Sequence, residues 1–465
     1  MLINLLKKIK PSKILEKKKS EITDKEISIR KYPYPYKCLL SINNDTDGFH
    51  YSSFKSFHEF VNGKKSTIFG QGLNLEISDS FWIYSKRNVS LYKNLPWESN
   101  KKNKYFEEIL ELCRLGILDT LHGFGDWVED FNLERKQIDK ILNLLSKNNI
   151  NLEVYVNHGG YNMSHNYAGI WSYYQQADNT NHKSYCFDLL IKYGFKYFWA
   201  DPFYEFTKFG DDLNFNNNDF EFNLQQYDFS KFLFKPNPKD FTKSEEVLNQ
   251  YDEKSLNNYK RDLFNSTLIK NISRDGIKNF MFKRFRGIDG PTSSNFVLQV
   301  NPENLDALER LEGTIILYQH FGIRRAILMG KGHESQEYTT DKNVLDFNNI
   351  AAFKLLAKRY NEGRILITTT RKLLNYIRVR DYLDFNINNI QDQTFINIKG
   401  INCPVYGYQK IEKNMLSGVT FQIKNINKIP KVLLNNKQVK VNKIIDKENG
   451  NTFIYFPWKK NDWPL

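Results

Sequence analysis

Residues 38–48, CLLSINNDTDG, decide which fold the sequence predicts. The run from Cys38 to Ile42 is apolar, as is typical of a strand that is buried on both faces. Asp45 and Asp47 follow where that strand must end, and Gly48 suits the turn into a loop. Functional side chains at the carboxyl ends of buried strands are typical of α/β folds, so this stretch predicts an α/β protein with a site at one edge of its sheet.

Similar apolar runs recur along the chain, with amphipathic helical patterns between them. Strands are predicted at 73–77, 81–84, 115–121, 152–156, 195–199, 279–282, 314–317 and 365–368, and helices at 104–114, 134–147 and 345–360. Alternation of strands and helices implies parallel pairing. About seven or eight such units favour a closed (β/α)7-8 barrel over the alternative, an open doubly wound sheet.

Two stretches depart from this alternation and suggest the domain organisation. Residues 203–275 are rich in Asn, Asp, Lys and Phe with weak periodicity. We interpret them as an insertion between two units of the barrel that could line or cover a site. From residue 385 onward, short strands alternate with turn signals, which predicts a small β-sandwich over 385–465. The predicted barrel domain therefore spans 31–384 and follows a basic N-terminal tail, residues 1–30.

The positive charge of the chain lies mostly near its two ends. The net charge is +14, yet residues 1–19 hold seven Lys against one Glu, and residues 402–465 hold eleven Lys against four acidic residues. The main body is therefore nearly neutral, and the excess is Lys rather than the Arg that suits bidentate phosphate recognition. We expect no nucleic-acid partner. An aromatic content of 15% excludes a disordered chain.

Cysteine usage and hydropathy indicate the compartment. Cys38, Cys113, Cys186 and Cys403 show no disulfide or zinc spacing, and no apolar run is long enough to span a membrane. We expect a cytoplasmic protein. The basic residues 1–19 are either a frayed terminus or a weak contact with the anionic inner face of a membrane.

Three residues at the ends of predicted strands could bind a metal ion. Asp47 follows the first strand, and His122 and Asp126 lie four residues apart in a Gly-rich segment after another strand. Two carboxylates and an imidazole leave coordination positions open for water and substrate, which a catalytic metal needs. The alternatives are a helix-capping Asp and a structural His.

Other predicted strand ends also carry titratable groups. His158 follows the strand at 152–156, Asp201 follows the strand at 195–199, and His320 follows the strand at 314–317. Because the carboxyl ends of parallel strands meet at one edge, these groups are expected near the predicted metal site.

These ordered segments resemble the motifs of the polysaccharide deacetylase (NodB-type) family of metal-dependent carbohydrate esterases and de-N-acetylases. Asp47-Gly48 stands where the first family motif ends, His122-Gly123-Phe124-Gly125-Asp126 has the spacing of the second, and Ile315-Ile316-Leu317 leading to His320 is similar to the last. The resemblance covers residues 37–376. Thr46 occupies the place of the usual base, as expected of a divergent branch like those in bacterial surface-polysaccharide gene clusters.

The resemblance implies a barrel of the glycoside hydrolase/deacetylase type and a metal-dependent hydrolase that removes acetyl groups from a polysaccharide or its precursor. It implies a divalent ion, with zinc expected, held by Asp47, His122 and Asp126. Asp45 would be the base and His320 the acid that protonates the leaving amine. We expect Asp201 to orient His320, and His158 to be an extra ligand or an oxyanion donor.

A carbohydrate is the partner that this resemblance implies. Aromatic residues near the predicted strand ends could stack on sugar rings, namely Trp82, Trp127, Tyr161 and Trp199. Two other functions stay open at this point. One is a glycoside hydrolase that uses a carboxylate pair such as Asp45 and Asp201. The other is a catalytically lapsed glycan-binding or assembly protein.

Overall fold

The computed structural model describes most of the chain outside its N-terminal end and one long internal segment. The described residues are 27–85, 89–93, 101–125, 133–157, 163–167, 175–199, 266–285, 292–326, 336–390, 393–424, 429–446 and 450–464. Residues 1–26 of the predicted tail and most of the predicted insertion at 203–275 lie outside them. Within the described part, no helix is both long enough and apolar enough to cross a membrane.

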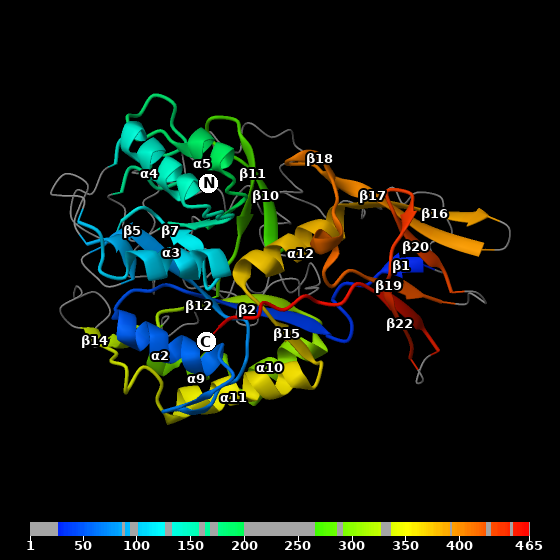
Figure 1. Cartoon of the computed structure of the whole chain (residues 1–465), viewed down its shortest axis with the longest axis horizontal. Helices are drawn as coiled ribbons and strands as arrows, with labels where there is room; N and C mark the ends of the chain where they lie inside the picture. The colour runs from blue at the N-terminus through cyan, green and yellow to red at the C-terminus, as the bar shows by residue number, and fades with distance from the viewer. Residues whose placement is uncertain are drawn as a thin grey trace, which may run out of the picture.

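A curled, mostly parallel sheet forms the centre of the α/β part (Figure 1). Its strands lie in the order β10 (Leu268–Ile272), β11 (Lys278–Phe282), β9 (Tyr197–Trp199), β8 (Val154–Val156), β7 (Leu118–His122), β5 (Ser78–Tyr84), β2 (Cys38–Asn44) and β12 (Thr314–Gln319). Two further strands join beside this path: β15 (Ile365–Ile367) pairs with β2, and β6 (Ser90–Tyr92) pairs with β5. Every residue of β2 is buried, as its apolar run predicts.

The predicted closed barrel is wrong, because the sheet is open. Its path ends at β10 on one side and at β12 on the other, and β10 pairs antiparallel with β11 as a hairpin. A barrel needs a continuous hydrogen-bonded ladder around the whole circle. Among the described residues, the only backbone strand pairing between the two sides is the isolated parallel bridge of Phe285, just beyond β11, with Leu317 of β12. The curled sheet is therefore a half-barrel.

Helices cover the sheet and separate it from the C-terminal strands. Figure 1 shows α3 (Phe106–Leu115), α4 (Arg135–Lys147) and α5 (Phe187–Tyr193) grouped on one part of the sheet. It shows α2 (Tyr51–Val61), α9 (Phe296–Gln299), α10 (Pro302–Arg310) and α11 (Phe347–Asn361) grouped on another. Helix α12 (Thr370–Tyr382) lies between the sheet and the C-terminal strands. The helices predicted at 104–114, 134–147 and 345–360 are thus confirmed as α3, α4 and α11.

Local sequence signals explain where these helices begin and end. The Asp346 carboxylate accepts a hydrogen bond from the backbone N–H of Asn349 (2.8 Å) and caps α11. Helix α3 ends at Gly116, which has a φ of 74°. The strand predicted at 73–77 is absent, because Leu73 and Leu75 donate backbone hydrogen bonds to the end of α2 instead.

The C-terminal strands, joined by β1 from the predicted N-terminal tail, form two sheets that share one core with the back of the α/β part. One sheet has the order β1 (Ile27–Ile29), β19 (Thr420–Ile423), β23 (Thr452–Tyr455) and β22 (Asn442–Ile445). The other has the order β16 (Leu383–Ile390), β17 (Gln393–Cys403), β20 (Lys431–Leu434) and β21 (Lys437–Gln438), and β18 (Gly407–Lys410) pairs with β17. Their buried side chains contact those of α12 in a single cluster. The chain then returns to the α/β part, where Trp463 Nε1 donates to the Leu115 carbonyl (2.7 Å).

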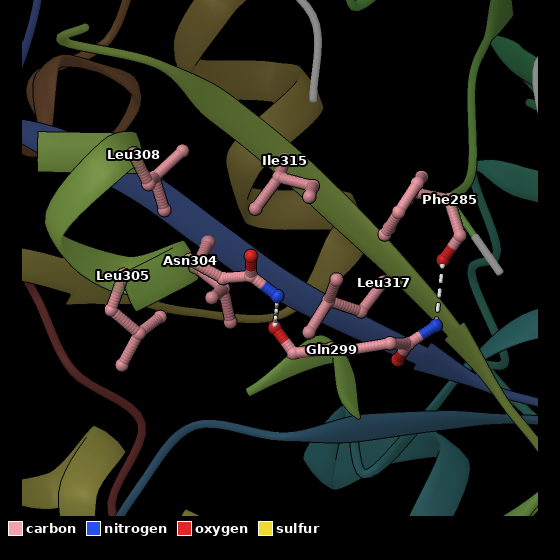
Figure 2. Close-up of a pocket in the computed structure, with 8 residues that line it drawn as sticks. Phe285, Gln299, Asn304, Leu305, Leu308, Ile315 and Leu317 are labelled. Carbon is pink, nitrogen blue, oxygen red and sulfur yellow. Dashed lines mark hydrogen bonds between the residues drawn. The ribbon is translucent and has the colours of Figure 1, made fainter. Parts of the chain in front are cut away.

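A small apolar pocket lies behind β12, between that strand and α10 (Figure 2). Its lining is Leu40, Phe285, Gln299, Asn304, Leu305, Leu308, Ile315 and Leu317, none of which is titratable. Gln299 Nε2 donates to the Phe285 carbonyl (3.3 Å) and Asn304 Nδ2 donates to the Gln299 carbonyl (3.1 Å). These bonds help to hold the segment after β11 against β12.

Candidate metal centre

Asp45, Asp47 and His122 meet at one edge of the curled sheet and could hold a metal ion. Each offers one ligand atom, and these atoms lie within 4.8 Å of one another. His122 Nε2 lies 3.5 Å from Asp45 Oδ2, and His122 Nδ1 lies 3.8 Å from Asp47 Oδ2. The exposed fraction of each side chain is 5% or less, so an ion held here would be largely shielded from water.

The carboxyl ends of β2 and β7, which lie on either side of β5, bring this group together. The Asp45 N–H donates to the Gln319 carbonyl (2.8 Å), which extends the pairing of β2 with β12 past the end of β2. His122 is the last residue of β7, and Gly123 then turns the chain with a φ of 57°. Since β2 and β7 both flank β5 in parallel, their carboxyl ends lie at the same edge.

Two glycines allow the loop after Asp47 to lie directly against the loop after His320. Gly48 has a φ of 78°, and a Cβ placed on it would lie 2.6 Å from the Gly322 carbonyl oxygen. A Cβ on Gly322 would lie 2.2 Å from the Asp47 carbonyl oxygen. Any larger residue at either position would push the two loops apart.

His320 lies beside the three-residue group, on its more open side. His320 Nε2 lies 3.4 Å from Asp47 Oδ2 and 4.0 Å from Asp45 Oδ2, and the Tyr318 hydroxyl lies 3.3 Å from the same nitrogen. The exposed fraction of the His320 side chain is 14%, against 2% for His122. Of the two histidines, His320 is therefore the one that a substrate could reach.

Arg284 is part of the site, although no sequence pattern pointed to it. Its Nη1 lies 3.0 Å from each carboxylate oxygen of Asp45 and donates to Asn43 Oδ1 (2.7 Å). Its guanidinium carbon lies 3.8 Å from the ring centroids of both Trp199 and Tyr318. The two rings hold the planar cation between them through cation–π contacts. A basic residue soon after a predicted strand is the only signal that could have drawn attention to it.

Asp45 is held as a carboxylate even though it is fully buried. Burial by itself would raise the pKa of Asp45, but the Arg284 guanidinium, with smaller contributions from His122 and His320, lowers that pKa below its usual value. The Ser80 hydroxyl also donates to Asp45 Oδ1 (2.8 Å). A charged Asp45 is therefore available as a ligand or as a proton acceptor.

The predicted stacking residues Trp82 and Trp199 pack against two side chains of the site. The Trp82 ring stacks on the His122 ring, with centroids 5.0 Å apart and an angle of 18° between the planes, and Trp82 is fully buried. Trp199 covers one face of Arg284 and has an exposed fraction of 8%. In this structure both rings pack inside the protein and hold functional side chains in place.

The structure thus brings together Asp45, Asp47, His122 and His320 from the predicted site. Five other predicted site residues lie outside the described residues, namely Asp126, Trp127, His158, Tyr161 and Asp201. Within the described part, Asp45 joins Asp47 and His122 as the third possible ligand. Two carboxylates and one imidazole, all buried and close together, fit the hard and borderline ligands that divalent ions take.

Comparisons with known proteins identify no relative of this chain. No protein-family model, no curated protein and no solved structure matches the chain.

Proposed function

We propose that this protein is a metal-dependent hydrolase that removes acetyl groups from a carbohydrate, with zinc as its ion. The observation that carries the proposal is the buried group of Asp45, Asp47 and His122, with a second imidazole, His320, on the open side. A divalent ion bound there would act as a Lewis acid toward an acyl carbonyl and the attacking water.

The surrounding side chains support the proposal of acyl hydrolysis. The pKa of Asp45 is lowered and its Oδ2 lies 4.0 Å from His320 Nε2, so a carboxylate that could accept a proton lies close to an imidazole that could donate one. In this proposal Asp47 and His122 hold the ion, Asp45 beside them takes the proton of the attacking water, and His320 gives a proton to the leaving amine or alcohol. Arg284 keeps Asp45 ionised, and Trp82 holds the His122 ring in its orientation.

Two observations support the choice of substrate and ion. The short segments at Asp47-Gly48, at 122–126 and before His320, which resemble motifs of the polysaccharide deacetylases, favour an acetylated polysaccharide or its precursor. A set of two carboxylates and one imidazole with open coordination positions is compatible with catalytic zinc. The reaction is therefore proposed as hydrolysis of an acetamide or an acetyl ester.

The test combines metal analysis with product analysis. The full chain is purified, its metal content is measured, and acetate release from acetylated oligosaccharides is followed with added zinc, cobalt or manganese. We expect about one ion per chain and acetate release that a chelator abolishes. Asp47→Asn should lose both the ion and the activity. A folded wild-type protein that binds none of these ions and releases no acetate would overturn the proposal.

Asn349→Ala is a matched control for these measurements. Asn349 is buried in α11 and donates to Ser293 Oγ (2.8 Å), and in the described part of the chain no hydrogen bond joins either residue to Asp45, Asp47 or His122. The variant loses a buried hydrogen bond comparable to those in the site, so it reports a general loss of stability. It should keep its metal ion and its acetate release.

A further inference from the structure

We propose that Asn44, Asp79 and His58 form a buried positioning network that sets the place of His320. The inference rests on the proposed function, in which His320 is the proton donor. None of the three residues touches the metal ligands through its side chain, so each would act through the backbone of the His320 loop. The network joins helix α2, the start of β5 and the end of β2 to that loop.

The network is a continuous chain of hydrogen bonds in the protein interior. His58 Nε2 lies 3.2 Å from Asp79 Oδ2, and Asn44 Nδ2 donates to the same oxygen (2.8 Å). Asn44 Oδ1 accepts from the backbone N–H of Phe321 (2.8 Å). All of these side chains have exposed fractions of 1% or less. Buried polar groups of this kind are costly to leave unpaired, so the network strongly favours one geometry.

Strand alternation separates this network from the metal ligands. Asp79 and Ser80 are neighbours in β5, and their side chains point to opposite faces of the strand. The Ser80 side chain reaches Asp45, whereas the Asp79 side chain reaches Asn44 and His58. The same strand end therefore supports the Asp45 carboxylate on one face and holds the His320 loop on the other.

Asn44 is the link whose chemistry is most specific. Its Oδ1 must face Phe321, because a backbone N–H only donates, and its Nδ2 therefore faces Asp79 Oδ2. A carboxylate in this place would set a second acidic group against Asp79. The amide is thus suited to join an acidic side chain to a backbone donor.

Two further contacts hold Phe321 in place, one through its ring and one through the turn that contains it. A displacement of Asn44 would therefore also displace His320, the residue before Phe321. The Phe321 ring stacks on Phe57, the residue before His58 in α2, with centroids 4.8 Å apart. The backbone N–H of Ile323 donates to the His320 carbonyl (3.0 Å), which closes a tight turn around Phe321. Asn44 Oδ1 holds the N–H of Phe321 inside this turn. His320 comes directly before Phe321, so its position is fixed with that of the turn.

The experiment compares the His320 ring signal among variants of the full chain in the absence of metal. Histidine labelled with a ring isotope is followed by NMR, and His320→Gln identifies the His320 signal. We expect Asn44→Ala and Asp79→Ala to move this signal, whereas Asp79→Asn, whose side-chain oxygen can still accept from Asn44 Nδ2, leaves it closer to its wild-type position. Asn349→Ala should not move it.

With zinc and an acetylated substrate, the same variants should separate by activity. Loss of such supporting contacts typically costs about 10- to 100-fold. We expect Asn44→Ala to lower kcat by that amount with little change in KM, and Asp79→Asn to restore most of the rate. The NMR measurement needs no activity, so a wild-type protein without acetate release would end the proposed function and leave this inference open to test.

Two results would overturn the positioning role. One is a folded Asn44→Ala protein whose His320 signal and activity match those of Asn349→Ala. If Asn44→Ala does not fold, Asn44→Ser is the second variant, because its shorter polar side chain cannot span Asp79 and the Phe321 N–H. An unchanged His320 signal in folded Asn44→Ser would overturn the inference equally.

Discussion

Arg284 Nη1 lies 3.0 Å from both carboxylate oxygens of Asp45, and both side chains are fully buried. The pair joins the segment just after β11 to the segment just after β2, which lie on opposite sides of the opening in the sheet. Beside a group that could bind a divalent cation, a permanent positive charge would be unfavourable without this carboxylate. Asp45 therefore serves the fold and the candidate site together.

Removing the Arg284 charge should destabilise the protein and raise the pKa of Asp45. Arg284→Met leaves a buried carboxylate without its main cation, which costs about 3–5 kcal/mol of the free energy of unfolding. In the wild-type protein the pKa of Asp45 is lower in the folded state than in the unfolded chain. The Asp45 carboxylate therefore stabilises the folded state above the unfolded pKa, and this stabilisation is lost as pH falls through the folded pKa. Urea unfolding as a function of pH measures this. The double variant Arg284→Met/Asp45→Asn should be more stable than Arg284→Met alone. If the losses of stability of the two single variants simply add in the double variant, the coupling of Arg284 and Asp45 is contradicted.

Substituting Gly322 should separate the loops that carry Asp47 and His320. In Gly322→Ala the new methyl group would lie 2.2 Å from the Asp47 carbonyl oxygen. This oxygen belongs to the backbone, which cannot move aside as a flexible side chain could. We expect a loss of about 1–3 kcal/mol of stability and weaker metal binding. Gly276→Ala is a control for a site with open space, since no atom lies within 4 Å of a Cβ there, although its φ of 81° adds local strain. Calorimetry of zinc binding to both variants separates the effects, and equal zinc affinities would contradict the prediction.

Zinc should stabilise the wild-type protein through the three-residue group. An ion that binds only the folded state raises the free energy of unfolding by about 2.7 kcal/mol at a hundred times its Kd. The increase in Tm on adding zinc should vanish in His122→Gln and in Asp47→Asn. Thermal unfolding with and without zinc measures it, and His182→Gln is a control at a histidine outside the site. A variant of the group that keeps the full zinc-dependent shift would show that the ion binds elsewhere.

Glu153 should make stability depend on acid pH without involving the site. Burial by itself would raise the pKa of Glu153, but the Lys196 ammonium and the Asn375 amide, which donate to it, lower that pKa below its usual value. Its contribution is therefore present above the unfolded pKa and disappears as pH falls through the folded pKa. Glu153→Gln should cost about 1–3 kcal/mol at neutral pH, with the gap to wild type narrowing on acidification. A gap that stays constant across the acid range would contradict this.

How much of the site the sequence could predict depends on the range of each interaction. The apolar run before Asp45 and the strand before His122 are local signals, and both lie in the sheet as predicted. Arg284 could not be placed in advance, because its role depends on the pairing of Phe285 with Leu317 and on two aromatic rings from other strands. The Asn44 network escaped notice for the same reason, since its hydrogen-bonded pairs are 21, 35 and 277 residues apart along the chain.

The sequence by itself determined the alternation of strands and helices and the placing of acidic and histidine residues at strand ends, because hydrophobic periodicity and turn residues act within a few positions. Only the tertiary structure decided that the sheet stays open. Closure requires ladder pairing between β12 and the segment after β11, and the described chain makes that contact at one bridge. The structure also decided that Asp45 lies with Asp47 and His122, because the direction of each side chain follows from strand register and from the charge of Arg284.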